Sequence, residues 1–274
     1  MRDKIRKILI VILSLVLLFS LFKIIQINVQ NSKEDDEFKD LAEKVEVIRE
    51  TESIVKETKS VINEEDEELK RALEEEQKRK EIAERLAKYN ELHKENSDLF
   101  GWIKIDDSVI DYPVMFTPND PEFYLHKSFY KKYTYSGCIF VDANCQDDCN
   151  NYLLHGHHMK NGTMFAGLMK YKDKEYWKSH PVIKFDTLDE ANEYLIIAAF
   201  ESKVYKANDE VFKYYNYTHI DSEDKFNEYI EGINKLKLYD TEVEVSYGDE
   251  FITLSTCAYH TENGRFVVIG VKKK

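Results

Sequence analysis

A cysteine and an arginine stand at the facing ends of two apolar segments near the C-terminus. FITLSTC ends at Cys257 and RFVVIGV begins at Arg265, and the stretch between them carries the turn-forming residues Asn263 and Gly264. If the two segments pair as antiparallel strands, Cys257 and Arg265 face each other with Cβ atoms about 5 Å apart. A guanidinium at that distance favours a thiolate and can bind an oxyanion. The pattern indicates a nucleophile, with a core cysteine at the end of a strand as the alternative.

A histidine cluster supplies the proton-transfer group that such a nucleophile needs. In LLHGHHM an apolar run leads into His155, Gly156, His157 and His158. An imidazole beside a cysteine can donate and accept protons during nucleophilic catalysis. On these residues alone, catalysis and core packing both stay open for Cys257.

The elements that must position these residues are short strands. From Phe100 onward, eight apolar segments alternate with polar turns: GWIKI, VIDYPVM, GCIFVD, NYLLHGH, EYLIIAAFESKVY, EVEVSYGD, FITLSTCA and RFVVIGVKK. About eight short strands in some 175 residues predict a β-barrel or a sandwich. Apolar residues at helical spacing predict additional helices at 163–171 and 222–236.

The N-terminal segment, residues 1–27, has the composition of a membrane anchor. Four basic residues precede an apolar run at 8–22, which continues past Lys23. About 20 such residues can cross a bilayer, and the basic flank predicts the N-terminus inside and the remainder outside. A cleaved signal peptide is the alternative, but the apolar region is long for one and no small-residue cleavage site follows it.

A charged stretch separates the anchor from the strands. Residues 31–80 carry 18 acidic and 11 basic side chains, and residues 31–97 contain neither proline nor glycine. We predict a partly helical stalk at 28–78 and a catalytic domain at 79–274. The segment 79–94 is amphipathic, and we expect it to pack against that domain.

Charge and cysteine content narrow the class of protein. The net charge of −13 argues against a nucleic-acid-binding protein. Four cysteines are too few for a disulfide scaffold. Cys145 and Cys149 precede the histidine cluster, but their spacing matches no common zinc pattern, so no metal site is predicted. Solvated loop thiols or one local disulfide are the preferred readings of this pair.

Five segments resemble class B sortases. They are FGWIKIDDSVIDYPVM, FYLHKSF, SGCIFVD, HGHHMKNGTMF, and TLSTC followed by an arginine that begins a terminal strand. They occur in the family's order over about residues 80–274. The resemblance implies a mostly β fold, an eight-stranded sortase-type β-barrel with a few peripheral helices. An N-terminal helix, a charged stalk and a transmembrane anchor would precede it.

The resemblance also assigns roles to individual residues. It makes Cys257 the nucleophile, His157 the general acid and base, and Arg265 the group that stabilises the oxyanion and positions substrate. Ser255 and Leu125 would line the groove for a sorting peptide.

Other residues near these positions receive weaker or negative assignments. His155, which stands where the family commonly has tyrosine, and His158 would be bystanders or pocket lining. Tyr259 stands where some members have an acidic residue, although Glu262 lies in the same loop. We expect that His260 is not the base.

The activity implied is that of a membrane-anchored, single-pass Gram-positive cysteine transpeptidase with its catalytic domain outside the cell. Such an enzyme cleaves a C-terminal sorting motif of an exported protein after threonine through a thioacyl-enzyme. It then transfers the protein to an amine of a peptidoglycan precursor or cross-bridge, and it requires no cofactor. The alternatives are a pilin-polymerising sortase that uses a protein lysine, a cysteine hydrolase, and an inert membrane-tethered scaffold.

Overall fold

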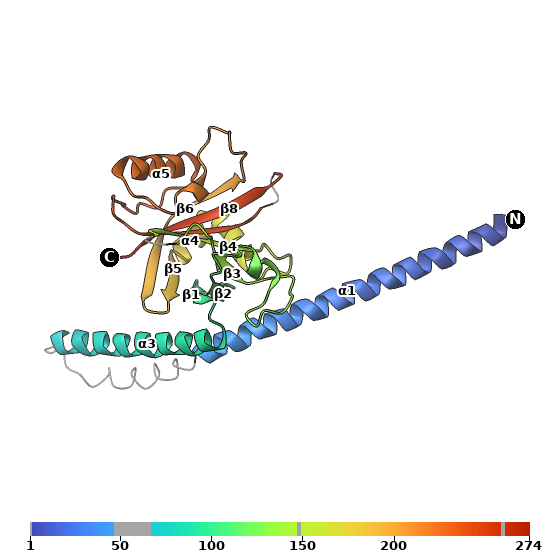
Figure 1. Ribbon diagram of the computed structural model, residues 1–274, viewed down its shortest axis with the longest axis horizontal. Coiled ribbons are helices and arrows are strands. Elements are labelled where there is room, and N and C mark those ends of the chain that lie inside the picture. Colours follow the sequence, from blue (N-terminus) through green and yellow to red (C-terminus); the bar gives the residue numbers. More distant parts are fainter. Residues whose placement is uncertain (1, 47–66, 147–148, 259–260) are drawn as a thin grey trace. The chain divides into compact units, whose positions relative to one another are not determined.

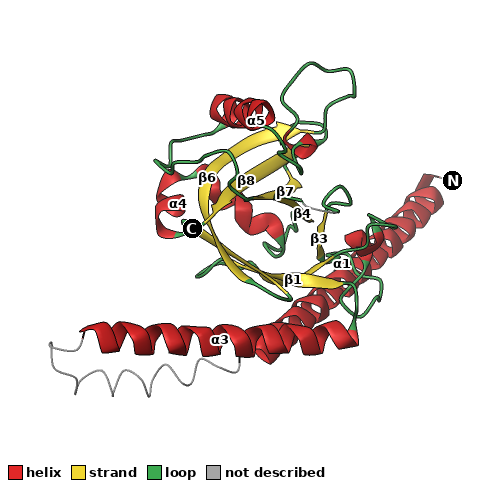
Figure 2. Cartoon of the chain, turned by 60° about the vertical axis from the view of Figure 1, so that its left-hand side comes forward, coloured by secondary structure: helices red, strands yellow, loops and turns green. Residues whose placement is uncertain are grey.

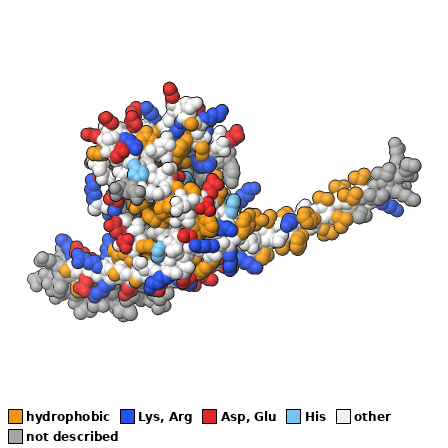
Figure 3. All heavy atoms as spheres, in the orientation of Figure 1, with side chains coloured by type: hydrophobic (Ala, Val, Ile, Leu, Met, Phe, Trp, Pro, Cys, Tyr) orange, Lys and Arg blue, Asp and Glu red, His pale blue; other side chains and the backbone are white. Residues whose placement is uncertain are grey.

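The computed structural model describes residues 2–46, 67–146, 149–258 and 261–274 (Figure 1). The chain divides into two compact units, Met1–Asp40 and Leu41–Lys274. The first unit falls within helix α1 (Arg2–Glu46), which runs without a break through the predicted anchor. The apolar side chains described between Leu9 and Val29 are exposed, Leu13 by 62% and Phe19 by 62%, and Figure 3 shows hydrophobic side chains along the helix.

Among the described residues, α1 is the one helix long and apolar enough to cross a membrane. Its candidate span is Ile12–Val45, and the most apolar 18-residue window has a mean hydropathy of 2.1. The predicted stalk lies partly outside the described residues, at 47–66. Its described parts are helical, at the end of α1 and the start of α3 (Glu67–Glu95). Helix α3 crosses residues 78 and 79, so the boundary drawn there stays a prediction.

The second unit contains a closed barrel of eight strands, which confirms the predicted fold (Figure 2). The strands are β1 (Leu99–Lys104), β2 (Asp111–Met115), β3 (Ile139–Val141), β4 (Asn151–Gly156), β5 (Val182–Thr187), β6 (Ala191–Lys203), β7 (Phe251–Cys257) and β8 (Gly264–Lys272). They close in the order β1-β2-β3-β4-β7-β8-β6-β5. The pairs β2–β3 and β4–β7 are parallel, and the other strand pairs are antiparallel.

Strand β7 is buried on both faces, because every residue from Phe251 to Thr256 is inaccessible to solvent. Two tyrosines outside the barrel cover one of these faces. Tyr229 of α5 (Glu223–Leu236) lies 3.4 Å from the Thr253 hydroxyl, and Tyr214 of η4 (Tyr214–Asn216) lies 2.8 Å from the Ser255 hydroxyl. A strand held from both sides gives Cys257, its last residue, a fixed position.

The predicted helices form close to their expected bounds. The segment predicted at 163–171 forms the 3₁₀ helix η3 (Phe165–Lys172), which the short α4 (Lys174–Ser179) follows. The segment predicted at 222–236 forms α5, and Ser222 caps it by accepting a hydrogen bond from the Lys225 amide. A further 3₁₀ helix, η2 (Phe123–His126), lies between β2 and β3.

One predicted strand is wrong, and one strand was not predicted. The segment EVEVSYGD forms no strand, because Glu242 adopts φ 60° and Ser246 and Asp249 close a turn with two hydrogen bonds of 2.8 and 3.1 Å. The missing strand is β5, whose buried Ile183 and Phe185 alternate with Lys184. The predicted number of strands was therefore right although one member was not.

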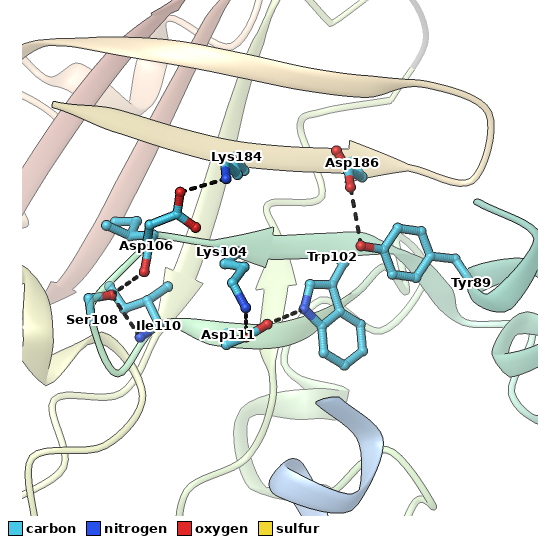
Figure 4. Close-up of polar contacts among 10 residues, drawn as sticks. Tyr89, Trp102, Lys104, Asp106, Ser108, Ile110, Asp111, Lys184 and Asp186 are labelled. Carbon is cyan, nitrogen blue, oxygen red and sulfur yellow. Dashed lines mark hydrogen bonds and ion pairs between the residues drawn. The ribbon is translucent and has the colours of Figure 1, made fainter. Parts of the chain in front are cut away.

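Helix α3 packs on the barrel, as predicted for 79–94 (Figure 4). Its Tyr89 ring stacks on Trp102 of β1 at 5.8 Å and an interplanar angle of 9°. The buried carboxylate of Asp186 in β5 accepts hydrogen bonds from Tyr89 Oη at 3.1 Å and Arg85 Nε at 2.8 Å. The aromatic stack and the buried carboxylate are thus among the contacts that attach the helix, and Asn90 Nδ2 adds a hydrogen bond of 3.1 Å to the Leu188 carbonyl.

Candidate active site

Cys257 and Arg265 are directly opposite each other in the antiparallel pair β7–β8, which confirms the predicted pairing. Both side chains are partly exposed, whereas their strand neighbours Thr256 and Phe266 are buried. Arg265 Nη1 donates to the Gly264 carbonyl at 3.0 Å. The guanidinium is therefore held at the beginning of β8, at the same end of the hairpin as the thiol.

The turn between the two strands is tight at its β8 end. Ala258 donates its amide to the Gly264 carbonyl at 3.0 Å, and Asn263 adopts φ 56°, a backbone region that asparagine tolerates well. Glu262 is exposed in this turn. Tyr259 and His260 lie outside the described residues, so the expectations for them stay predictions.

His157 reaches the same end of the barrel through the parallel pairing of β4 with β7. Gly156 pairs with Thr256, and Thr256 Oγ1 donates to the Gly156 carbonyl at 2.8 Å. His157 directly follows Gly156, and Cys257 directly follows Thr256. Pairing of neighbouring parallel strands, about 4.8 Å apart, thus brings together two residues that are a hundred positions apart in sequence.

Gly156 is required by the packing around the end of β4. A Cβ atom at this position would lie 2.4 Å from Ile139 Cδ1 and 2.7 Å from Phe165 Cδ2. Both side chains are fully buried, so neither can move freely. The absence of a side chain allows the strand to pass these residues and to present His157 beyond them.

The His157 ring is held by a carbonyl on one side and by a second imidazole on the other. Its Nε2 lies 2.8 Å from the Leu125 carbonyl oxygen, and since only an N–H can donate there, the neutral ring leaves Nδ1 as its acceptor. The His126 ring stacks on it at 5.3 Å. Burial lowers the pKa of His157, the hydrogen bond to Leu125 opposes this, and the neighbouring His126 lowers the pKa further. The imidazole is therefore neutral at neutral pH.

The two flanking histidines have contacts that the sequence did not indicate. His158 Nδ1 donates to the Cys257 carbonyl at 3.0 Å and so fixes the backbone that carries the thiol. His155 Nε2 lies 2.9 Å from Asp142 Oδ2. Burial raises the pKa of Asp142, but its hydrogen bonds with His155 and Asn144 prevail and lower it. The sequence predicts His158 only as a bystander or pocket lining, because its contact with Cys257 depends on the pairing of β4 with β7.

The two residues predicted to line a peptide groove have different surroundings. Leu125 lies in η2, is partly exposed, and contributes its carbonyl to His157. Ser255 is 1% exposed, and its hydroxyl is paired with Tyr214. Their role toward a substrate stays a prediction. His126 was not foreseen, because its relation to His157 depends on how the segment between β2 and β3 folds.

Three further cysteines and one cavity lie outside the Cys257, His157 and Arg265 set. Cys138, Cys145 and Cys149 are free thiols, and Cys145 is buried rather than solvated. No group of three or more His, Cys, Asp or Glu side chains able to hold a metal occurs in the described part of the chain. A cavity of about 580 Å³ lies beside α3, β1 and β5, and Cys257, His157 and Arg265 are absent from its lining. Its two lysines, Lys104 and Lys184, are paired with Asp111 and Asp106 (Figure 4).

Comparison with known proteins agrees with this architecture. Residues 103–273 match the family model of the sortase domain. A sortase B from Listeria monocytogenes is 33% identical over 184 residues, which cover 66% of this chain and 72% of that protein. The solved structure of sortase B from Listeria monocytogenes, also 33% identical, superposes with a TM-score of 0.57 over 66% of this chain and 98% of that one. A Staphylococcus aureus sortase B–substrate complex has the same fold, with a TM-score of 0.67, 20% identity, and coverage of 90% and 99%.

The closed eight-stranded barrel of this chain is thus matched at the level of family, sequence and structure. The chain belongs to the sortase family. Its relatives are class B sortases, and it is accordingly a cysteine transpeptidase of the sortase B type.

Proposed function

We propose that Cys257, His157 and Arg265 carry out the transpeptidation. The observation that supports this proposal is the strand register: Cys257 pairs with Arg265 across β7–β8, while β4 ends beside β7 one residue before His157. Three side chains suited to nucleophilic attack, proton transfer and anion stabilisation therefore share one end of the barrel.

In the first half of the reaction, His157 Nδ1 accepts the proton of the Cys257 thiol, and the resulting thiolate attacks the carbonyl carbon of the threonine in a C-terminal sorting motif. The tetrahedral oxyanion that forms is stabilised by Arg265, and His157 donates a proton to the departing amine. The peptide bond breaks, and a thioacyl-enzyme remains on the Cys257 sulfur. The bond from His157 Nε2 to the Leu125 carbonyl supports this role, because it leaves one ring nitrogen for proton transfer.

In the second half, an amine of a peptidoglycan precursor or cross-bridge attacks the thioacyl carbon. His157 accepts the proton of that amine, the carbon–sulfur bond breaks, and the Cys257 thiolate is released. The low pKa of His157 supports this step, since a neutral imidazole is the form that can accept a proton. The product is an exported protein attached to the cell wall through a new amide.

We further propose that α1 anchors the enzyme as a single-pass membrane protein, with the N-terminus inside and the barrel outside. The exposed apolar surface of α1 and the basic residues before it support this arrangement. The partners would then be exported proteins that carry a sorting motif and a cell-wall amine. The S. aureus sortase B crystallised with its substrate supports a peptide substrate for this chain as well.

The test uses the purified full-length chain in detergent with a library of quenched sorting peptides, with and without cell-wall amines. We expect that Cys257→Ala abolishes turnover, that His157→Ala lowers kcat about 10²–10⁴-fold, and that Arg265→Ala lowers it about 10²–10³-fold. His155→Ala, which removes an imidazole two residues away, is the matched control and should keep most activity. Turnover by Cys257→Ala would refute the assignment, and transfer to a protein lysine alone would indicate a pilin polymerase.

A further inference from the structure

Two cysteines lie together in the loop that joins β3 to β4. Cys145 is 5% exposed, and Cys149 is partly exposed. Both thiols point at one backbone atom, the carbonyl oxygen of Asn151, with Sγ–O distances of 3.6 and 3.3 Å. The Leu153 amide also donates to Cys145 Sγ at 3.3 Å. The first residues of β4 thus hold one sulfur firmly and place the second beside it.

The two sulfurs are neighbours of each other as well as of Asn151. The interaction with Cys145 is the largest factor that lowers the pKa of Cys149, and it acts against the effect of burial. The same interaction raises the pKa of Cys145. One member of the pair is therefore the better nucleophile, and the other keeps its proton until the first has reacted.

The other two cysteines are separate from this pair. Cys138 is 1% exposed and precedes β3 in the core. Cys257 lies at the opposite end of the β4–β7 pair, because β4 begins at Asn151 beside the two thiols and ends at Gly156 beside Thr256. Five residues of strand span roughly 16 Å. A bond between Cys257 and either loop cysteine would require that this part of the barrel unfold.

We propose that Cys145 and Cys149 are a redox modification site that closes reversibly to an intramolecular disulfide, with low-molecular-weight disulfides as the oxidant. The Cys149 thiolate attacks one sulfur of the oxidant and forms a mixed disulfide with it. The S–S bond of the oxidant breaks, and its other sulfur leaves as a thiolate that takes up the proton that Cys149 lost. The Cys145 thiol then loses its proton and attacks Cys149 Sγ, and the second half of the oxidant is released as a thiol. Two protein thiols are oxidised by two electrons, and one small disulfide is reduced to two thiols.

This proposal does not depend on the catalytic assignment, because it concerns the loop before β4 and leaves Cys257 as a thiol. The disulfide would replace the two hydrogen bonds from the thiols to the Asn151 carbonyl with one covalent bond between Cys145 and Cys149. It would restrain the loop that precedes β4, and His157 follows the other end of that strand.

The test uses the full-length chain in detergent, equilibrated with mixtures of reduced and oxidised glutathione. The protein is then denatured, its remaining thiols are alkylated, and the intact protein and its peptides are analysed by mass spectrometry. We expect that two thiols no longer react with the alkylating reagent, that the protein mass shows no glutathione attached, and that a peptide cross-link joins Cys145 and Cys149. Cys257→Ala should behave identically at these two positions, which separates this result from any outcome for catalysis.

The single variants examine the order of the steps. Cys145→Ser should accumulate a mixed disulfide of glutathione on Cys149, because the resolving thiol is absent, whereas Cys149→Ser should react far more slowly at Cys145. If Cys145→Ser does not fold, the cross-link and the thiol count in the wild-type protein still test whether the disulfide forms. A cross-link to Cys138 or Cys257, mixed disulfides alone, or a fully reduced pair under oxidised glutathione would each overturn the proposal.

Discussion

At the scale of single residues, burial and then the stacked imidazole of His126 lower the pKa of His157, the proposed acid and base. The two rings lie 5.3 Å apart at 22°, and both cannot carry a proton without repulsion. His157 is held by burial and by the Leu125 carbonyl, whereas the His126 side chain is exposed. His126 can therefore be changed without disturbing the core.

We predict that His126→Ala raises the pKa of His157, because His126 lowers that pKa through its charge. A raised pKa means that His157 becomes protonated at a higher pH. The acid limb of the profile of kcat/KM against pH should therefore shift to higher pH. NMR titration of the His157 ring provides a second measurement. His180→Ala, which removes an imidazole stacked on Tyr176, should leave the profile unchanged. A shift to lower pH in His126→Ala would contradict the argument.

A second prediction concerns the residue that leads into His157. Gly156→Ala places a Cβ atom against Ile139 and Phe165 at distances that real contacts do not reach. Overpacking of this kind costs about 1–3 kcal/mol of unfolding free energy, and the displaced backbone should also lower kcat. Denaturant unfolding and peptide cleavage measure the two effects. Gly162→Ala is the comparison for backbone strain without overpacking: its Cβ would meet nothing within 4 Å, but its φ of +87° strains any side chain, so it should lower stability and leave kcat near wild type. Wild-type activity in Gly156→Ala would show that the strand end can shift freely.

At the scale of elements, the carboxylate of Asp186 joins α3 to the barrel. Burial raises its pKa, and Arg85 and the Tyr89 hydroxyl oppose that rise. The Arg85 side chain is 36% exposed and that of Asp186 is 6% exposed, so solvent screens only one partner well. The pair is thus intermediate between a surface ion pair and a buried one.

We expect that Arg85→Ala destabilises the chain by about 1–3 kcal/mol at neutral pH, because Asp186 stays buried with Tyr89 as its remaining side-chain donor. The loss should shrink as the pH falls through the raised pKa of Asp186, since the protonated carboxyl no longer needs a cation. Thermal unfolding at several pH values measures this. Lys80→Ala removes an exposed ion pair with Glu76 on the same helix and should cause no measurable change. A deficit that grows toward acid pH would refute the explanation.

The sequence predicted the elements well where the signal was local. The pairing of Cys257 with Arg265 followed from two apolar segments and one short turn, and α5 followed from its apolar spacing. EVEVSYGD has the same alternation as a strand, but Thr241 Oγ1 bonds to the Ile197 carbonyl and Glu242 turns the chain away. This contact comes from β6, which no local pattern reveals.

Only part of the candidate site could be predicted, because some of its contacts depend on tertiary packing. His157 was selected over its neighbours by the resemblance to class B sortases, because HGHH alone does not distinguish its three imidazoles. The Leu125 carbonyl that orients His157 is 32 residues away, in a segment between β2 and β3 with one short 3₁₀ helix. Its position depends on tertiary packing, so neither this contact nor the His126 stack could be read from spacing.

At the scale of the whole molecule, the chain combines an exposed apolar helix with a barrel that has its own core. The unit Leu41–Lys274 contains all eight strands and every residue of the candidate site. Catalysis and attachment should therefore be separable. If α1 serves only to hold the enzyme at the membrane, its loss should change where the enzyme acts and not how it acts.

We predict that a chain lacking residues 1–30 cleaves free sorting peptides with kcat/KM within about twofold of that of the full-length chain, since no candidate catalytic residue is removed. With the full-length chain reconstituted in vesicles, a membrane-anchored substrate in the same vesicles should be cleaved much faster than by the truncated chain, because confinement to one surface raises the effective concentration. Centrifugation of the vesicles should leave the truncated chain in the supernatant and the full-length chain in the pellet. A truncated chain that sediments with the vesicles, or that fails on free peptides although its unfolding transition is normal, would show that the N-terminal helix does more than attach the enzyme.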